Sequence, residues 1–506
     1  MEPRKHLAMP LSLLSSPLDL SAGSMSRQQQ LLARFKRAIL GGQLPPGSRL
    51  PSTRSLCEQL QVARNTVLAV YEQLTAEGYA EADRQGTRVA TLLAMPAGIR
   101  AEPSVARQDR QRPSRRVSAI KSTRDAGDRA LPLTPGMPAL NRFALNAWLR
   151  AQERALKRAG PMALAYGEAL GEPALREAIA QYLRVARGVR CEAGQVVVTE
   201  GAQGALSLCV RLFANPGERA WVEDPGYGGV LAAFHSGDMK IRSMPVDDEG
   251  ILIADRDWRW PPRLIHVTPS HQYPTGAVLS LARRLALIAR AREHGCWIIE
   301  DDYDSDFCHH GHPIPAMQGL VPEAPVLYVG TFSKTLFPGL RIGFLILPAS
   351  VGEDTWRALA EMLRGGHRLE QLALAEFMAG GQFARHLGRM KRLYRERQQA
   401  LRAALQTHLP GLDISGGASG LHLTLRLPPG CADTAVSAAA RAAGMNVGAL
   451  SSFSAGPPQA RHNGLVIGYG NTSEEQYDAL IRRLAGIVRR TLRHQIRAWQ
   501  ADAGAA

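Results

Sequence analysis

Between residues 131 and 495, short apolar runs alternate with longer amphipathic stretches, and this alternation constrains the fold more than any other feature. Stretches with helical periodicity, such as Ser280–His294, separate the apolar runs. The runs are Gln195–Thr199, Ala220–Val222, Leu264–Val267, Trp297–Glu300, Val326–Gly330 and Ile342–Leu347. Strands that alternate with helices form parallel sheets, because each crossover helix returns the chain to the same edge. The region therefore predicts an α/β domain built on a largely parallel sheet.

A change in composition divides the chain of 506 residues. Residues 93–130 contain three prolines, nine Arg and Lys, and few large apolar side chains, which is typical of a linker. Residues 26–92 are compact and periodic. We therefore expect a multidomain protein with a flexible leader over 1–25, a small domain over 26–92, a basic linker over 93–130, the α/β domain over 131–495 and a tail over 496–506.

The positive charge of the chain is concentrated near its N-terminus. The net charge is +16, and the first 130 residues contain 20 Lys and Arg against 11 Asp and Glu. More than half of the excess charge therefore lies in the first quarter of the chain. A basic N-terminal part favours a polyanionic partner such as nucleic acid.

The cysteines and the apolar runs indicate the compartment. No CxxC pair and no metal-binding spacing occurs among the six cysteines, which are Cys57, Cys191, Cys209, Cys296, Cys308 and Cys431. This pattern predicts reduced thiols, no disulfide framework and no metal site. The N-terminal stretch lacks a signal-peptide core, and no run approaches the roughly 20 apolar residues that span a bilayer. We expect a cytoplasmic protein with no membrane contact.

Residues 26–92 predict a helix–turn–helix followed by a hairpin. A first helix covers Arg27–Leu40, Ser52 is a plausible N-cap for a second helix that ends near Leu60, and a third runs from about Arg64 to Glu77. Residues 79–82 and 88–90 can pair as a hairpin. This arrangement suits a recognition helix in the major groove with a wing beside it. A small helical cap without a ligand would show the same pattern.

Three stretches of this region resemble the winged helix-turn-helix of the GntR family. They are Leu50-Pro51-Ser52-Thr53-Arg54, Ala63-Arg64-Asn65-Thr66-Val67 and Leu74-Thr75-Ala76-Glu77-Gly78-Tyr79. The resemblance implies that double-stranded DNA is a partner. It assigns contacts with phosphates, bases or groove edges to Ser52, Arg54, Arg64, Asn65 and Thr66, and a wing at the minor groove to Gly86 and Thr87. Arginines at helix starts suit both phosphate anchoring and guanine recognition. The alternative for Arg54 and Arg64 is a solvated face.

In the larger domain, two segments carry reactive groups at the ends of predicted strands. Gly330-Thr331-Phe332-Ser333-Lys334 supplies a lysine that can form a Schiff base with an aldehyde cofactor, and Arg341 with the two hydroxyls could hold a phosphate. Asp301-Asp302-Tyr303-Asp304 could offer a carboxylate to a protonated pyridine nitrogen and a phenol to a ring oxygen. Alone, this second segment would indicate an acidic surface loop or a metal site.

Two further segments suit the same ligand, although each is a weak signal by itself. Thr199-Glu200-Gly201-Ala202-Gln203-Gly204-Ala205 leads a strand into a helix, whose free N–H groups favour phosphate. Asp224-Pro225-Gly226-Tyr227 places an aromatic ring where it could stack on a pyridine, or it could be an ordinary turn.

Together, the four segments resemble a fold-type I, aspartate-aminotransferase-like domain that binds pyridoxal 5′-phosphate (PLP). More narrowly, the chain resembles the MocR subgroup of GntR regulators, which joins such a domain to a winged helix. The resemblance implies that Lys334 carries the Schiff base, that Asp301 rather than Asp302 pairs with the pyridine nitrogen, that Tyr303 bonds the ring oxygen, and that Tyr227 stacks on the ring. It assigns the phosphate to Gly201, Ala202, Gln203, Thr331, Ser333 and Arg341.

Two positions depart from the pattern of catalytic aminotransferases. Tyr273 stands where catalytic members carry the asparagine of an Asn-Pro-Thr-Gly motif. The stretch Asn463–Tyr469 is apolar where they carry a carboxylate-binding arginine, and Arg461 cannot be assigned to the site from the sequence. These departures favour a sensor over a metabolic enzyme.

The predicted function is therefore a transcription regulator whose larger domain senses PLP, an amino compound or both. The resemblance implies a head-to-tail homodimer, which suits repeated DNA half-sites on the nucleoid. One alternative is a catalytically active aminotransferase with an N-terminal extension. Another is a DNA-binding protein that has kept a relic domain without using PLP.

Overall fold

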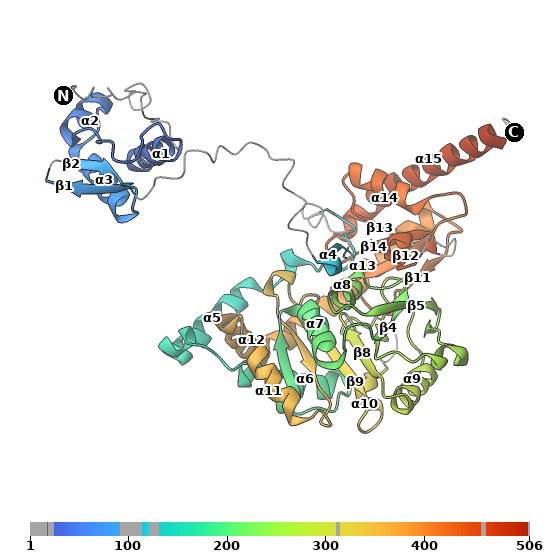
Figure 1. Cartoon of the computed structure of the whole chain (residues 1–506). Helices are drawn as coiled ribbons and strands as arrows, with labels where there is room; N and C mark the ends of the chain where they lie inside the picture. The colour runs from blue at the N-terminus through green and yellow to red at the C-terminus, as the bar shows by residue number, and fades with distance from the viewer. Residues whose placement is uncertain are drawn as a thin grey trace. The chain divides into compact units, whose positions relative to one another are not determined.

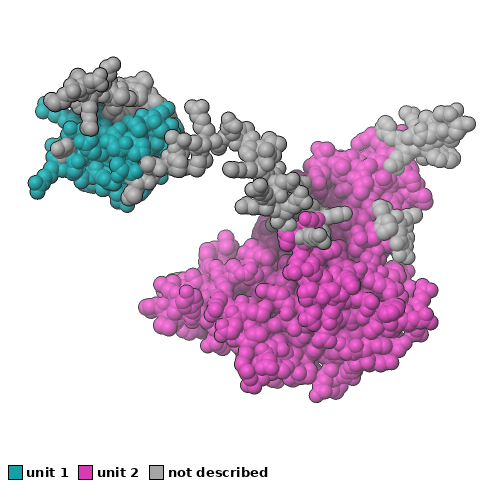
Figure 2. All heavy atoms as spheres, viewed as in Figure 1, with its two compact units in different colours: residues 1–112 teal, residues 113–506 magenta. Residues whose placement is uncertain are grey.

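The computed structural model describes Leu18 and residues 25–84, 86–91, 114–118, 120, 131–309, 314–456 and 462–503. The chain forms two compact units, residues 1–112 and residues 113–506, which Figure 2 colours separately. Most of the predicted leader and linker, and the end of the tail, lie outside the described residues.

The small unit contains the predicted helices in the predicted order. They are α1 (Arg27–Leu40), α2 (Thr53–Leu60) and α3 (Arg64–Ala76), followed by β1 (Ala80–Asp83) and β2 (Gly86–Val89). Ser26 caps α1 in a capping box, and the Ser52 hydroxyl accepts from the N–H of Ser55 at the start of α2. Fully buried Leu31, Phe35 and Leu56 form the centre of its core, and Leu18 is also buried there.

The hairpin of the small unit is tighter than the sequence predicts. Asp83 and Gly86 pair with each other, so they extend the antiparallel ladder instead of belonging to the turn. Gly86 has a φ of +126°, which favours glycine. The Leu50 N–H donates to Thr87 O at 2.8 Å, so the segment before α2 lies along the hairpin.

The larger unit is built on an eight-stranded sheet in the order β3-β10-β9-β8-β7-β4-β5-β6. The strands are β3 (Val196–Thr199), β4 (Arg219–Asp224), β5 (Lys240–Asp247), β6 (Gly250–Ile251), β7 (Leu264–Val267), β8 (Trp297–Asp302), β9 (Val326–Thr331) and β10 (Gly343–Ile346). The central strands pair in parallel, as predicted. β10 runs antiparallel between β3 and β9, because only a short loop through Lys334 and Arg341 connects it to β9.

Helices surround this sheet, and the chain then forms a second, smaller sheet (Figure 1). The helices are α4 (Arg115–Ser118), α5 (Leu145–Ala159), α6 (Pro173–Arg187), α7 (Gly201–Phe213), α8 (Gly228–Ser236), α9 (Leu281–Glu293), α10 (Met317–Leu320), α11 (Glu353–Met362), α12 (Arg368–Ala379), α13 (Gln382–His408), α14 (Asp433–Ala442) and α15 (Tyr477–Ala503). The antiparallel sheet β11-β12-β14-β13 consists of β11 (Ile414–Ser415), β12 (His422–Arg426), β13 (Gly448–Ala449) and β14 (Gly464–Gly468).

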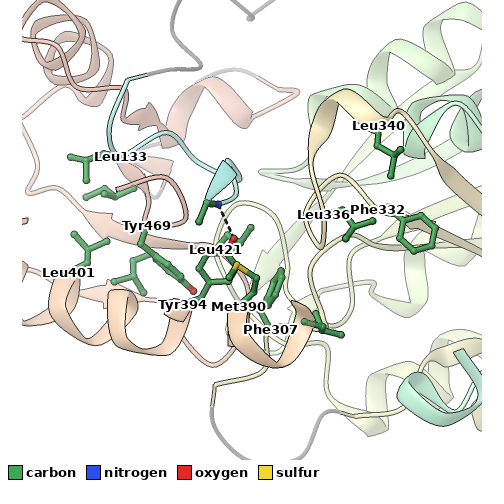
Figure 3. Packing of buried hydrophobic residues seen from close by; sticks show 14 of the residues in the cluster. Leu133, Phe307, Phe332, Leu336, Leu340, Met390, Tyr394, Leu401, Leu421 and Tyr469 are labelled. Carbon is green, nitrogen blue, oxygen red and sulfur yellow. Dashed lines mark hydrogen bonds between the residues drawn. The ribbon is translucent and has the colours of Figure 1, made fainter. Parts of the chain in front are cut away.

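The largest apolar cluster connects the two sheets of the larger unit (Figure 3). Phe332 and Leu336, from the loop after β9, belong to the same cluster as Tyr394 of α13 and Leu421 near β12. The Tyr394 hydroxyl accepts from the Ala139 N–H at 2.9 Å, which also fixes the segment before α5. The loop that carries Lys334 is therefore anchored in the main core.

Two further findings concern the predicted linker and the membrane. Within the linker, α4 lies against the larger unit, where Arg116 pairs with Asp238 at 2.7 Å. In the part of the chain that the structure describes, no helix combines the length and the apolar character needed to cross a membrane.

Candidate functional site

The lysine that follows β9 is fixed by its neighbours in sequence and by a distant backbone group. Phe332 and Leu336 flank Lys334 and are both buried. Lys334 Nζ donates to Gly136 O at 2.7 Å. Gly136 has a φ of +68°, and a Cβ there would lie 3.0 Å from Nζ, so glycine allows this segment to approach the amine.

The three acids at the end of β8 point to alternate faces of the sheet, as strand geometry requires. Glu300 and Asp302 share one face. Glu300 accepts from the N–H groups of Met317 at 2.8 Å and Gln318 at 3.0 Å, and burial raises the pKa of Glu300 to about 7. Glu300 is therefore committed to holding the segment around α10.

Asp302 is committed to a buried ion pair. Its Oδ2 lies 2.8 Å from Arg187 Nε and accepts from the Tyr328 hydroxyl at 2.7 Å. Burial alone would raise the pKa of Asp302, but the charge of Arg187 keeps that pKa below its usual range. Asp302 Oδ2 therefore has its partners within the protein, and its charge is balanced by Arg187, although its Oδ1 is buried without a hydrogen-bond partner among the described residues.

Asp301 lies on the opposite face and has an unused oxygen. Its Oδ2 is 3.3 Å from His266 Nε2, and both side chains are buried. Its Oδ1 is buried and has no hydrogen-bond partner among the described residues. A buried acceptor without a donor is costly. The orphaned Oδ1 therefore fits a ligand that brings an N–H, as a protonated pyridine does.

Next to this strand, Tyr303 and Tyr273 form part of an aromatic wall. The Tyr303 hydroxyl donates to His271 O at 3.0 Å and lies 3.1 Å from His271 Nδ1. Tyr273 packs edge-on against Tyr303, with ring centroids 5.9 Å apart, and also against Tyr227 and Phe453. Tyr273 thus occupies the position of the absent asparagine with a ring that contacts both predicted ring-binding tyrosines.

An anion-binding corner forms where α7 begins. Glu200 offers no side-chain cap, so the first N–H groups of α7, from Gly201, Ala202 and Gln203, are free of such a partner. Arg341 donates to Glu200 O at 3.0 Å, and a Cβ on Gly201 would lie 3.5 Å from the Arg341 guanidinium. Free N–H groups beside a guanidinium suit a phosphate.

The other predicted phosphate and stacking residues lie close to one another in two pairs. The Thr331 hydroxyl donates to Ser333 Oγ at 3.0 Å. Gln203 donates to Gly229 O at 3.0 Å, and a Cβ on Gly229 would overlap both the Tyr227 ring and the Gln203 amide. The structure therefore brings Tyr227 next to the start of α7.

The stretch predicted to lack a carboxylate-binding arginine forms β14, and all five of its residues are buried. Arg461 lies outside the described residues. Sequence reasoning did not identify Gly136, Arg187, His266 or His271 as part of the site. Their contacts span 32 to 198 residues of chain. Only the motif around His271 gave a local signal for any of them.

In the small unit, the predicted DNA-contacting residues share one exposed region of the helix–turn–helix. Arg54 leaves 90% of its side chain exposed, and its ion pair among the described residues is with Glu58 one turn on. Arg64 and Asn65 begin α3 and are exposed, whereas Val67 faces the core. Val67 therefore anchors α3 in the core of the small unit, while the side chains of Arg64 and Asn65 remain accessible to a binding partner.

The wing has a further basic residue that the sequence did not indicate. Arg49 is exposed, and its backbone forms a bridge to Arg88 of β2. Its guanidinium would lie 3.3 Å from a Cβ on Gly86, so it covers the start of β2 beside Thr87. Arg49 lies 37 positions before Gly86, which is why the sequence alone does not place it there.

Comparisons with known proteins agree with this architecture. The profile of the family described as "Aminotransferase class I and II" matches residues 133–484, and that of "Bacterial regulatory proteins, gntR family" matches residues 27–89. The chain is 39% identical to the probable rhizopine catabolism regulatory protein MocR of Rhizobium meliloti, over 87% of this chain and 89% of that protein. It is 33% identical to the HTH-type pyridoxine biosynthesis transcriptional regulator PdxR of Corynebacterium glutamicum, over 88% and 92% of the two chains.

The larger unit also resembles solved aminotransferases. One is LysN, the α-aminoadipate aminotransferase of Thermus thermophilus, in complex with N-(5′-phosphopyridoxyl)-L-leucine. The TM-score is 0.67 at 27% identity, and the match covers 75% of this chain and 97% of that chain.

Proposed function

The chain belongs to the MocR-type members of the gntR family of bacterial regulatory proteins, with an aminotransferase class I and II domain as its larger part, and from this premise we propose how it works. It is a DNA-binding transcription regulator. Its larger unit holds PLP, and occupation of that site by PLP, or by PLP joined to an amino compound, changes the affinity for DNA. A ligand can act in this way only if it binds two conformations differently.

One observation carries the cofactor assignment, namely the buried Asp301 carboxylate, whose Oδ1 has no partner among the described residues and which, unlike Asp302, is not paired with Arg187. This buried acceptor meets the pyridine nitrogen, while Lys334 holds the cofactor covalently, Tyr303 meets the ring oxygen and Tyr227 covers the ring. The phosphate lies in the corner of Gly201, Ala202, Gln203, Thr331, Ser333 and Arg341. When bound, PLP supplies an electrophilic carbon to which an amine can be joined.

The DNA side of the proposal rests on exposure and charge in the small unit. Arg54 and Arg64 project their guanidinium groups from the starts of two helices, where they can reach phosphates or guanine edges. Asn65, Thr66 and Ser52 contact the groove or backbone next to them. Gly86 and Thr87 bring the wing to the minor groove, with Arg49 as an additional phosphate contact.

A head-to-tail homodimer is the proposed assembly, since it presents two winged helices to repeated half-sites. An exposed apolar surface on the larger unit supports a second copy as its partner. It consists of Leu145, Leu149 and Leu156 of α5 and Met162, Leu164 and Tyr166 just after it, which are 42% to 94% exposed. Monomeric proteins rarely leave so many neighbouring apolar side chains in water.

The central experiment measures binding of the full chain to its own promoter DNA with and without PLP. We expect PLP to change the dissociation constant by about 5- to 150-fold, the usual range of coupling between two sites. Lys334→Ala should abolish covalent capture of PLP by borohydride and remove the response. Light scattering of the same samples gives the mass of one chain or two. Adding amines to the PLP-loaded protein tests whether an amino compound is a second effector.

Lys240→Ala is the matched control, because Lys240 is an exposed lysine at the start of β5 and lies outside the proposed cofactor site and the α5 surface. This variant should keep both the capture and the response. Equal DNA affinity with and without PLP in the wild-type chain would refute the sensor proposal. Sustained turnover of an amino acid and a keto acid by the wild type would instead favour the aminotransferase alternative.

A further inference from the structure

A buried cluster of polar side chains lies behind Tyr303. His271 follows β7, Asp304 follows β8, and His422 begins β12 of the smaller sheet. Their side chains are almost inaccessible to water, and they come together from three parts of the chain. None of the roles proposed above uses them.

The hydrogen-bond partners fix where the hydrogens lie in this cluster. His271 Nδ1 is 3.0 Å and 3.2 Å from the two carboxylate oxygens of Asp304. Burial raises the pKa of Asp304, while His271 and Lys334 oppose that rise and favour the ionised form. The ionised carboxylate only accepts, so Nδ1 carries the hydrogen of His271. The same Nδ1 lies 3.1 Å from the Tyr303 hydroxyl, whose own hydrogen is donated to His271 O. The Nδ1–H is therefore shared between Asp304 and Tyr303.

His422 is a neighbour of this pair and not a second cation. Its Nε2 lies 3.0 Å from Pro274 O, which only accepts, so Nε2 carries the hydrogen and Nδ1 is a bare lone pair. Burial, and then the nearby His271, hold the pKa of His422 well below its usual range. The two rings are 4.6 Å apart between centroids. His422 is therefore a neutral side chain whose ring packs against His271.

The backbone closes tightly over His271 and Asp304. Gly420 has a φ of +83°, and a Cβ there would overlap both the His271 ring and the Asp304 carboxylate. Only glycine permits this approach, which leaves no room for water on that side of the pair. The backbone thus confines the His271 ring on this side, and the contacts of Nδ1 with Asp304 and with the Tyr303 hydroxyl orient it.

We propose that Asp304 and His271 are positioning residues that orient the Tyr303 hydroxyl toward the ring oxygen of the cofactor. This inference rests on the proposed function. Because the Nδ1–H of His271 supplies a bond that Tyr303 accepts, the phenol hydrogen can turn from His271 O to the cofactor oxygen without leaving the phenol oxygen unpaired. Asp304 holds the imidazole in the tautomer that makes this possible.

The bond from Tyr303 is expected to set the pH at which the nitrogen that joins Lys334 to the cofactor loses its proton. A phenol that donates to the ionised ring oxygen competes with the protonated nitrogen that joins Lys334 to the cofactor, so it lowers the affinity of that nitrogen for its proton. The charged and titratable groups that act on Tyr303 or on the pair come from every neighbouring element. They are Glu223 of β4, Tyr273 after β7, Asp301 and Asp302 of β8, Lys334 after β9, His422 of β12 and Tyr469 after β14.

The test is a pH titration of the absorbance of the PLP-loaded full chain. Tyr303→Phe should move the midpoint to higher pH by the largest amount. His271→Leu and Asp304→Asn should move it in the same direction, by roughly half a unit to one unit, which corresponds to one hydrogen bond. His271→Asn should restore most of the wild-type midpoint, because the asparagine amide can donate from the place of Nδ1.

A double variant separates positioning from general packing. Tyr303→Phe with His271→Leu should give the same midpoint as Tyr303→Phe alone, since His271 acts through Tyr303. Additive shifts would overturn the inference, and so would an unmoved midpoint in both His271→Leu and Asp304→Asn. If His271→Leu does not fold, Asp304→Asn decides. A wild-type chain with no cofactor band at all would instead overturn the proposed function.

His422→Gln is the matched control, because the glutamine amide can keep the bond to Pro274 O and leaves Tyr303 untouched. Its midpoint should stay within about 0.2 unit of the wild type, well under the shift of one hydrogen bond. His271, Asp304 and His422 also have ligand atoms within 4.8 Å of one another, as a metal site would. A midpoint that moves on treatment with a chelator, or in His422→Gln, would replace the positioning role with a metal site.

Discussion

Arg54 of the small unit leaves 90% of its side chain exposed, whereas Arg187 of the larger unit leaves 3%. Arg54 pairs with Glu58, four residues away on the same helix, and Arg187 pairs with Asp302 across 115 residues of chain. An exposed arginine is free to meet a polyanion, while a buried one is committed to structure. The small unit thus has an arginine that is exposed for contact with a partner, and the larger unit has one that is buried and stabilises the fold.

The strongest test of this contrast is the loss of Arg187. Arg187→Met leaves the buried Asp302 carboxylate without its cation, and we expect the free energy of unfolding to fall by about 3–5 kcal/mol. Arg54→Ala should change it by less than about 0.5 kcal/mol. All seven tryptophans lie in the larger unit, so tryptophan fluorescence during urea unfolding measures the effect of Arg187→Met. Far-UV circular dichroism of the small unit's own transition measures the effect of Arg54→Ala.

A double variant shows whether the stability lost in Arg187→Met comes from the unpaired charge of Asp302 or from the other contacts of Arg187. Arg187→Met combined with Asp302→Leu removes both charges and should recover most of the lost stability, because an apolar pair can replace a buried ion pair. If the double variant is as unstable as the single one, the bonds from Arg187 to Ser270 and Ile314 are the main contribution instead.

The same contrast explains what the sequence could predict. Helices α1 and α3 were predicted to within one residue, because their apolar periodicity and the glycines that follow them, Gly41 and Gly78, are local signals. The acids at the end of β8 were located, but the choice of Asp301 over Asp302 came from family resemblance. Strand alternation separates the two, and only the distant Arg187 shows which face is committed to the ion pair. Contacts across such distances leave no periodic trace in the chain.

A pH-dependent difference between the units is the next expected effect. Burial lowers the pKa of His386 to about 4, and its Nε2 donates to Thr335 O at 3.0 Å beside Lys334. The stability from this group is complete above pH 6.5 and is lost as the pH falls toward 4, because the unfolded histidine binds its proton first. We expect its share to be about 3 kcal/mol, because one unit of pKa shift corresponds to about 1.4 kcal/mol and His386 is buried.

His386→Gln removes this titration and keeps a donor for Thr335. Unfolding midpoints between pH 7 and pH 4 should therefore fall less steeply in the variant than in the wild type. The described residues of the small unit, 25–84 and 86–91, include no histidine, so its transition serves as an internal reference. Parallel curves for variant and wild type would show that His386 binds its proton equally in the folded and the unfolded state.

The smallest expected effect concerns recognition by the small unit. Arg64→Ala removes one guanidinium at the start of α3, and we expect DNA binding to weaken by about 1–2 kcal/mol, which is roughly 5- to 30-fold. The unfolding free energy should stay the same, because Arg64 is exposed. Arg37→Ala is the matched control, since Arg37 is an exposed arginine of α1 outside the helix–turn–helix.

Salt dependence then separates two kinds of contact for Arg64. If Arg64 meets a phosphate, Arg64→Ala should weaken operator and unrelated DNA alike and reduce the slope of log K against log salt by about one. If it reads a base, the loss should fall on the operator alone. Equal losses in Arg64→Ala and Arg37→Ala would mean that only net charge matters and that α3 is not the recognition helix. Because Arg64 and Asn65 share the exposed start of α3 while Val67 faces the core, we expect the operator-specific outcome.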